Sequence, residues 1–140
     1  MVERGAVYNR AYAAQLRDFT GLNYGKITPT DIDAVIDFGG KACVIIEMKH
    51  KGARLPYGQA LAIERIIDGL QRGGVDSIAL IAEHDSKGDI DFALGTVVKY
   101  RWLGEWLEMK HNWTVRHAVD GFLIMRGLER YLAKPFSEAS

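Results

Sequence analysis

The spacing of hydrophobic and polar residues changes several times along this 140-residue chain, and each change predicts a new element. Between residues 31 and 38 apolar residues occupy every second position, as in a strand that buries one face. The Gly39-Gly40 pair then predicts a two-residue hairpin turn. Residues 41–49 have an apolar centre that indicates a partner strand buried on both faces. This part of the chain is therefore predicted to form a β-hairpin.

Helical elements are predicted in three stretches of the sequence. Apolar residues at spacings of three and four predict a first helix over residues 2–19 and a second over residues 57–72, which ends at Gly73-Gly74. The short apolar run 77–82 follows as a buried strand, so the second helix is expected to cross over between two strands. Residues 96–106 predict one or two late strands, and a final helix is expected from Trp113 or Thr114 to Ala133.

Composition limits the class of protein. The length fits one domain, residues 1–140, and 48% hydrophobic with 26% charged residues is typical of a folded globular chain. The single cysteine, Cys43, lies in an apolar run and is expected to be a core residue. No run approaches the ~18 apolar residues of a membrane span, and the charged N-terminus lacks the apolar segment of a signal peptide. We therefore expect a cytoplasmic protein without a membrane partner.

The charges of the chain balance, with 18 basic and 18 acidic residues and a net charge of zero. Proteins dedicated to nucleic-acid binding are often strongly basic, so this balance counts against tight non-specific DNA binding. It does not exclude an active site whose own acidic residues offset a basic groove.

Two acids and a lysine in the predicted hairpin carry the chemistry. Glu47 and Lys49 are two positions apart, so they project from one face of a strand. Asp33 precedes Glu47 by 14 positions, and the hairpin can place the two side by side. Two carboxylates suit a hard divalent cation such as Mg²⁺, and a lysine beside them can stabilise charge on phosphate oxygens. Phosphodiester hydrolysis needs this set of groups.

The pattern of Asp33, a glycine turn and Glu47-Met48-Lys49 resembles the PD-(D/E)XK nuclease superfamily. The resemblance covers residues 3–82, and the motif itself residues 28–49. It implies an α/β fold with a restriction-endonuclease-like αβββαβ core, whose mixed central sheet is flanked by helices, followed here by a C-terminal strand region and helix. It also implies Asp33, Glu47 and Lys49 as catalytic residues, with Asp33 and Glu47 as ligands of Mg²⁺ or Mn²⁺. The implied activity is a DNA endonuclease in recombination, repair or phage DNA processing. We expect low sequence specificity, because the sequence shows no added DNA-reading domain.

Three further residues have a weaker resemblance to family positions. The family's Pro-Asp pair is interrupted here, because one residue separates Pro29 from Asp31. Asp31 and Asp33 share a strand parity, so either could be the metal ligand, and a similar Glu-Ile-Asp form in some members favours Asp33. Gln59 resembles a Gln that some members carry after Glu-X-Lys, although a polar residue at a helix start is often simply exposed. Glu3 resembles an additional acidic ligand, although an acid in a first helical turn also complements the helix dipole.

Four basic residues are candidates for contact with DNA. Lys51 and Arg54 directly follow the Glu-X-Lys motif and are well placed for a phosphate backbone. Lys99 and Arg101 alternate with aromatic residues, as on some nucleic-acid surfaces. The same alternation describes an ordinary amphipathic strand, which is the favoured interpretation for this stretch.

Other functions compete with the nuclease. The two acids and the lysine could form a structural cross-strand ion pair at the end of a sheet. The chain could also be a nuclease-fold module that binds DNA or a protein without cutting, although the intact set of Asp33, Glu47 and Lys49 argues against this function. The match could also be accidental in an unrelated α/β protein. A nuclease this small needs a second copy to cut both strands of a duplex, so a homodimer is a further expectation.

Overall fold

The computed structural model of the protein describes residues 18–132. Residues 30–132 form one compact unit, and residues 18–29 belong to another. The described part of that other unit holds a short 3-10 helix, η1 (Thr20–Leu22), and an antiparallel bridge between Tyr24 and Ile27. The predicted first helix lies outside the described residues except for its last two positions, and Glu3 lies outside them as well.

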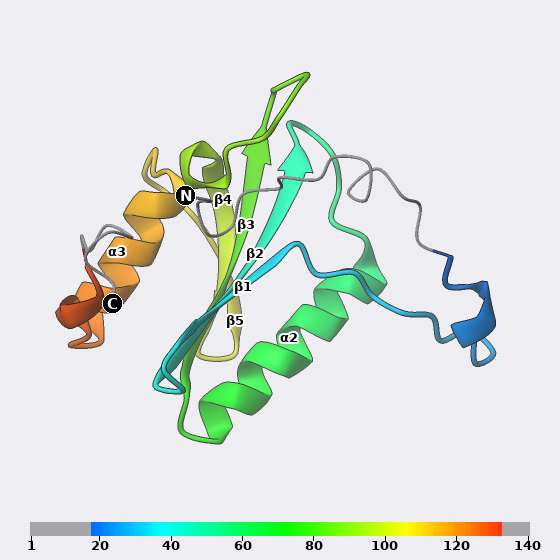
Figure 1. Ribbon diagram of the computed structural model, residues 1–140, viewed down its shortest axis with the longest axis horizontal. Helices are drawn as coiled ribbons and strands as arrows, with labels where there is room; N and C mark the ends of the chain where they lie inside the picture. Colours follow the sequence, from blue (N-terminus) through cyan, green and yellow to red (C-terminus); the bar gives the residue numbers. More distant parts are fainter. Residues whose placement is uncertain (1–17, 133–140) are drawn as a thin grey trace, which may run out of the picture. The chain divides into compact units, whose positions relative to one another are not determined.

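A mixed five-stranded sheet forms the centre of the unit 30–132 (Figure 1). Its order follows the sequence, and only the pair β2·β3 is parallel. The helix α2 (Tyr57–Arg72) connects these two parallel strands, so the predicted crossover connection is confirmed. The strands are β1 (Ala34–Phe38), β2 (Ala42–His50), β3 (Asp76–His84), β4 (Thr96–Trp102) and β5 (Glu105–Glu108).

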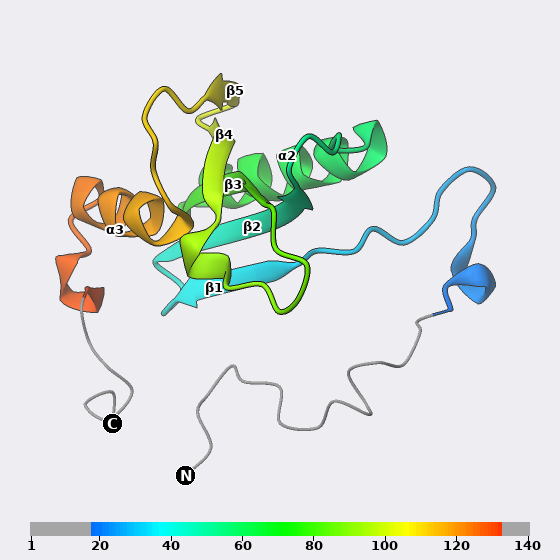
Figure 2. The same cartoon turned by 90° about the horizontal axis from the view of Figure 1, so that it is seen from above.

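One helix covers each face of the sheet, as Figures 1 and 2 show. On one face α2 buries Ile63 and Ile67 against residues of β2 and β3, among them Ile45. On the other face α3 (Val115–Met125) buries residues such as Phe122 against the alternate positions of the same strands, such as Val44. Because β2 is covered on both sides, its apolar run is continuous, and the expected α/β class with a mixed sheet between helices is confirmed.

The order of elements ahead of α2 differs from αβββαβ. That order has three strands before the second helix, whereas residues 18–56 hold two, β1 and β2. In addition, β1 begins at Ala34 because the chain bends at Asp33. Ile32 therefore packs on the α2 side of the sheet, although Ala34 packs on the α3 side.

The turn between β1 and β2 is one residue longer than the two-residue turn predicted. Phe38 pairs with Ala42, so residues 39–41 form the loop. Gly39 and Gly40 have φ angles of +60° and +73°, which glycine adopts without strain. With a two-residue turn every partner would shift by one position, and such a slip moves side chains to the opposite face. The third loop residue therefore sets the strand register. This register determines which side chains of the segment before β1 lie on the same face of the sheet as those of β2.

The C-terminal helix is shorter than predicted. It ends at Met125, and Gly127 has a φ of +71° in a Schellman motif. The amide of Leu128 donates to the carbonyl of Leu123, and that of Gly127 donates to Ile124. The prediction of one helix from Trp113 or Thr114 to Ala133 is therefore wrong beyond Met125, where a separate 3-10 helix, η3 (Glu129–Tyr131), follows.

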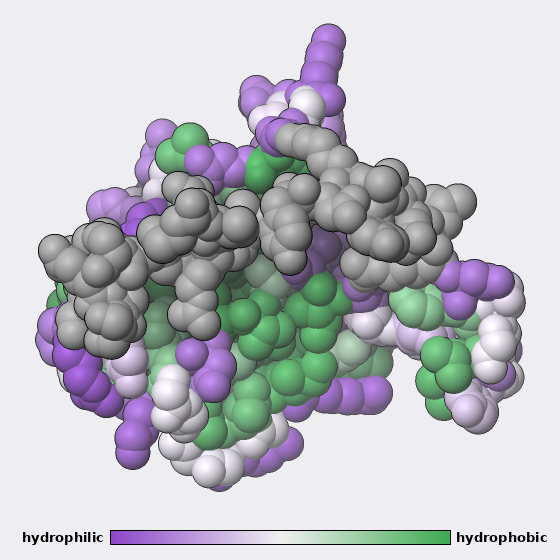
Figure 3. Space-filling view, in the orientation of Figure 1, coloured by the Kyte–Doolittle hydropathy of each residue, from purple (hydrophilic) through white to green (hydrophobic). Residues whose placement is uncertain are grey.

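Hydrophobic residues gather on the surface over β1 and the neighbouring part of α2 (Figure 3). Val35 and Ile66 are 57% and 40% exposed there, and β1 is an edge strand of the sheet. Within residues 18–132 no helix has the length and apolar character needed to cross a bilayer.

Candidate active site

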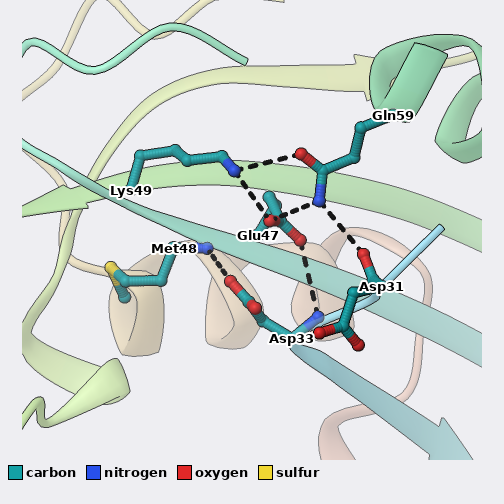
Figure 4. A network of polar contacts seen from close by, with 6 residues as sticks. All are labelled: Asp31, Asp33, Glu47, Met48, Lys49 and Gln59. Atoms are coloured by element: carbon teal, nitrogen blue, oxygen red, sulfur yellow. Dashed lines mark hydrogen bonds and ion pairs between the residues drawn. The ribbon is translucent and has the colours of Figure 1, made fainter. Parts of the chain in front are cut away.

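Four predicted site residues meet where β2, α2 and the segment before β1 come together (Figure 4). Glu47 and Lys49 lie in β2, Gln59 lies in the first turn of α2, and Asp33 lies directly before β1. The β1·β2 register pairs Ala34 with Ile46, which brings the preceding Asp33 opposite Glu47. The three-residue hairpin loop is thus the reason that these two acids are neighbours.

Glu47 is the centre of the polar network. Its side chain is buried, with 2% of the residue exposed. Its Oε1 accepts a hydrogen bond of 2.6 Å from Gln59 Nε2 and lies 3.1 Å from Lys49 Nζ. Its Oε2 accepts a longer bond, 3.4 Å, from the backbone N–H of Asp33. Both oxygens of this buried carboxylate are therefore engaged, as a buried charge requires.

The pKa of Glu47 is raised above its ordinary value. Burial is the largest cause, because the ionised form loses water, and the nearby charge of Asp33 acts in the same direction. The hydrogen bond and positive charge of Lys49 oppose the increase but do not cancel it. A second positive charge near the two acids would favour the ionised form of Glu47.

Asp33 is attached to β2 by its backbone and by its side chain. Its Oδ2 accepts a hydrogen bond of 2.8 Å from the amide of Met48, in addition to the contact between its own N–H and Glu47. Unlike Glu47, Asp33 is an exposed residue. The pair therefore combines one buried carboxylate with one carboxylate that solvent or a ligand can reach.

Gln59 connects three parts of the site through one amide group. Its Oε1 accepts a hydrogen bond of 3.0 Å from Lys49 Nζ. Its Nε2 donates to Glu47 and also, at 3.0 Å, to the backbone carbonyl of Asp31. Gln59 thus holds Lys49 and Glu47 in place and ties α2 to the segment that carries Asp33. Of the two candidate acids, Asp33 has its carboxylate bonded to β2, and Asp31 contributes its carbonyl to Gln59.

The donor set fits a hard divalent cation. In the part of the chain that the structure describes, no group of three or more His, Cys, Asp and Glu side chains could hold a metal. The two carboxylates that could hold a cation at this site are those of Asp33 and Glu47, whose residues are joined by the hydrogen bond from the N–H of Asp33 to Glu47. Mg²⁺ is commonly bound through one or two carboxylates, with waters and substrate phosphate as its other ligands. Such an ion would also relieve the repulsion that Asp33 adds to the ionisation of Glu47.

The four basic residues predicted to contact DNA do not form one surface. Arg54 and Lys99 line the same groove as Lys49. Lys51 lines a different hollow, together with four acids. The guanidinium of Arg101 is held by Asp68 of α2, at 3.1 Å from Nε to Oδ1 and 2.6 Å from Nη2 to Oδ2. Arg101 therefore joins β4 to α2, in agreement with the favoured interpretation of an amphipathic strand.

A β-bulge in β4 places Val98 on the α2 side, beside Lys99. Ala82 pairs with Val97 and Ile81 pairs with Lys99, so Val98 is the extra residue. As a result Val98 and Lys99 both line the groove on the α2 side, although they are adjacent in sequence. Bulges commonly redirect a side chain in this way. The only trace in the sequence is the Val97-Val98 pair, which interrupts the alternation ahead of Lys99.

Two acids of α2 were also missed by the sequence analysis. Glu64 accepts a hydrogen bond of 2.5 Å from Trp106 Nε1, and Asp68 pairs with Arg101. Their spacing of four residues places them on one face of the helix, which was a usable signal. They fix the β4·β5 hairpin beside the site.

The arrangement can hold a cation on two carboxylates and present the ammonium of Lys49 next to it. These groups could act on a phosphate or another anionic group that approaches from the exposed side of Asp33. No protein-family model, curated protein or solved structure matches this chain.

Proposed function

We propose that this protein is a divalent-metal-dependent DNA endonuclease that hydrolyses phosphodiester bonds with low sequence specificity. The observation that carries the proposal is the buried carboxylate of Glu47, bonded to Lys49 and Gln59 beside the second acid, Asp33. The resemblance of this motif to the PD-(D/E)XK superfamily supports the same function. The general class of the fold, a mixed sheet between helices, is compatible with this proposal.

Asp33 and Glu47 would hold Mg²⁺ or Mn²⁺. The ion would supply Lewis-acid stabilisation for the scissile phosphate and a source of nucleophilic water near neutral pH. Asp33 is fixed for this role by the amide of Met48, and Glu47 by Gln59. Because both carboxylates are held by other groups, little reorganisation is needed when a ligand binds.

Lys49 acts on the developing charge of the reaction. Its ammonium is 3.1 Å from Glu47 and 3.0 Å from Gln59, so the side chain has a defined position. From there it can orient the attacking water or donate to a phosphate oxygen as negative charge builds on it. Gln59 is a positioning residue, since it acts through Lys49 and Glu47.

A second candidate is a nuclease-fold module that binds DNA or a protein without cutting. One observation favours it: every buried polar side-chain atom in residues 18–132 has a hydrogen-bond partner, so the network is complete by itself. A complete network suits a structural ion pair as well as a metal site. Activity and metal dependence separate the two functions.

The test is incubation of plasmid, single-stranded and branched DNA with Mg²⁺, Mn²⁺ or EDTA. We expect cleavage with either metal, none in EDTA, and none with Glu47→Gln. A matched control is Asp120→Asn on α3, where a partly exposed acid away from the site pairs with Arg116. It should cut as the wild type does. Absence of cleavage in both metals, or full activity of Glu47→Gln, would contradict the nuclease.

A further inference from the structure

A groove of about 700 Å³ opens next to the site on the α2 side of the sheet. It shares Lys49 with the candidate active site, so a ligand in the groove would lie next to that site. One wall comes from the segment before α2 and from its first turns, and the other comes from β4 and β5. The residues important here are Lys49, Arg54, Tyr57, Ile81, Val98 and Lys99.

Three basic side chains line the groove, those of Lys49, Arg54 and Lys99. Arg54 is exposed, and Lys99 of β4 lies on the opposite wall, where its Nζ lies 5.1 Å from the ring centre of Trp106. Two acids, Glu64 and Glu83, also line the groove, so its basic side chains outnumber its acidic ones by one, and both acids already accept a hydrogen bond. Glu64 accepts the hydrogen bond from Trp106, and Glu83 accepts one of 3.3 Å from the amide of Gly52. A phosphate chain thus meets Arg54 and Lys99 as its partners.

Tyr57 provides an aromatic surface at the edge of this groove. It is the first residue of α2, two positions before Gln59, and it is 80% exposed. No other large hydrophobic side chain in residues 18–132 is as exposed. The groove behind it is apolar, with Ile81 and Val98 among its lining residues. An exposed ring over an apolar groove suits the flat face of a nucleobase.

We propose that this groove holds a single-stranded segment of DNA, with a base stacked on Tyr57 and phosphates at Arg54 and Lys99. The inference rests on the proposed function, and it names the form of DNA that the site receives. In a duplex the base faces are stacked inside the helix and cannot reach Tyr57. An apolar groove likewise suits unpaired bases, because a duplex presents its charged backbone. The balanced net charge of the chain agrees with a ligand that is held partly by stacking.

The first test measures binding without cleavage. A fluorescently labelled oligothymidylate of about 15 nucleotides is titrated with the full chain in EDTA, and its anisotropy is followed. We expect a duplex of equal length to compete poorly. Tyr57→Ala should weaken binding by about five- to a hundredfold, whereas Tyr57→Phe, which keeps the ring, should bind as the wild type does.

The second test examines the phosphate contacts. Arg54→Gln and Lys99→Gln should each reduce the slope of log affinity against log salt concentration by about 0.7, the value for one phosphate contact of a single strand. Lys41→Gln is the matched control, since Lys41 is exposed and lies next to the other end of β2. It should leave the slope unchanged.

The outcomes separate this inference from the proposed function. Equal competition by duplex, or unchanged binding by Tyr57→Ala, would overturn the groove as a single-strand site even if the protein cuts DNA. If instead the oligonucleotide binds as described and neither Mg²⁺ nor Mn²⁺ gives cleavage, the groove stands and the nuclease fails. No binding of the oligonucleotide at low salt would overturn the groove.

Discussion

Glu47 is a buried carboxylate next to a second acid, and its raised pKa reflects the cost of its ionised form. The neighbouring Lys49 and Gln59 reduce that cost without removing it. A carboxylate held in this way gains more from a bound cation than an exposed acid does, because water no longer screens its charge. The residue is therefore the most sensitive position at which to detect a metal.

Metal binding should stabilise the fold through these acids. A ligand that binds only the folded state adds about 2.7 kcal/mol when its concentration is a hundred times its dissociation constant. We expect Mg²⁺ or Mn²⁺ to raise the thermal midpoint of the wild type. Asp33→Asn and Glu47→Gln should lose this increase, and Asp120→Asn should keep it. An equal metal-dependent increase in Glu47→Gln would show that the metal binds elsewhere.

Lys49 should affect the rate of cleavage more than the binding of DNA. Its ammonium is fixed next to Glu47, where charge develops on the phosphate, so its contribution appears mainly in the transition state. We expect Lys49→Ala to reduce the single-turnover rate by about a hundred- to a thousandfold. Arg54→Gln should weaken binding instead, with little effect on the rate at saturating enzyme. If the two variants behave alike, Lys49 is only part of the basic groove.

At the scale of elements, the hairpin decides whether the site forms. Asp33 faces Glu47 because the loop has three residues, and both glycines in it have positive φ. Alanine at position 40 would be strained by its backbone alone, because no atom lies near the added Cβ. We expect Gly40→Ala to reduce the free energy of unfolding by about 1–2 kcal/mol. Gly40→Asn should cost less, since Asn tolerates this conformation, and urea titration compares the two. An equal cost for both variants would contradict a conformational cause.

The ion pair between Arg101 and Asp68 connects β4 to α2, and it should make stability depend on pH. The hydrogen bonds of Arg101 hold the pKa of Asp68 below its ordinary value of 3.8. The folded state therefore binds this proton less readily, and the stabilisation is present above pH 3.8 and lost as the pH falls below it. Asp68→Asn should cost about 1–3 kcal/mol at pH 7, and the difference from the wild type should shrink towards pH 3. Asp120→Asn, which breaks an exposed pair, should cost about 0.3–0.5 kcal/mol. A pH-independent cost of Asp68→Asn would exclude the ion pair as its cause.

Elements with a strong local pattern were predictable from the sequence. The second helix occupies residues 57–72 as predicted, because a regular apolar spacing ends at a glycine pair. The hairpin and the crossover were predictable for similar reasons. The start of β1 was not, since the bend at Asp33 depends on hydrogen bonds to β2. The third loop residue was not predictable either, because the length of the loop follows from the pairing of two strands and not from local periodicity.

The site was only partly predictable for the same physical reason. The motif Glu47-Met48-Lys49 identified its centre, because two polar residues at the end of an apolar strand need partners. The role of Arg101 depends on which helix packs against β4, and the side on which Val98 lies depends on a bulge. Such tertiary contacts can hardly be predicted from a single sequence. The groove beside Lys49 could therefore be recognised only in the folded structure.

At the scale of the whole molecule, the two faces of the sheet have different tasks. The α2 side carries the candidate active site and the groove, and the α3 side carries the larger group of buried residues. β2 contributes to both, since Ile46 and Met48, which alternate with Glu47 and Lys49 along the strand, point to the α3 side. Exposed residues on α3 can thus be changed as controls, whereas buried ones such as Phe122 support the strand that holds the site.

This division leaves one candidate active site in the described part of each chain, and if the proposed nuclease is correct, the products from a supercoiled plasmid should reveal it. One site breaks one strand in each encounter, so nicked circles should accumulate before linear DNA appears. If the groove receives single strands, a circular single-stranded substrate should be cut faster than the relaxed duplex, and Tyr57→Ala should reduce that preference. Gel electrophoresis of a time course measures both results. Linear product without a nicked intermediate would instead show that two copies act together. Sedimentation at the same protein concentration would then detect the homodimer, which we expect from the small size of the chain.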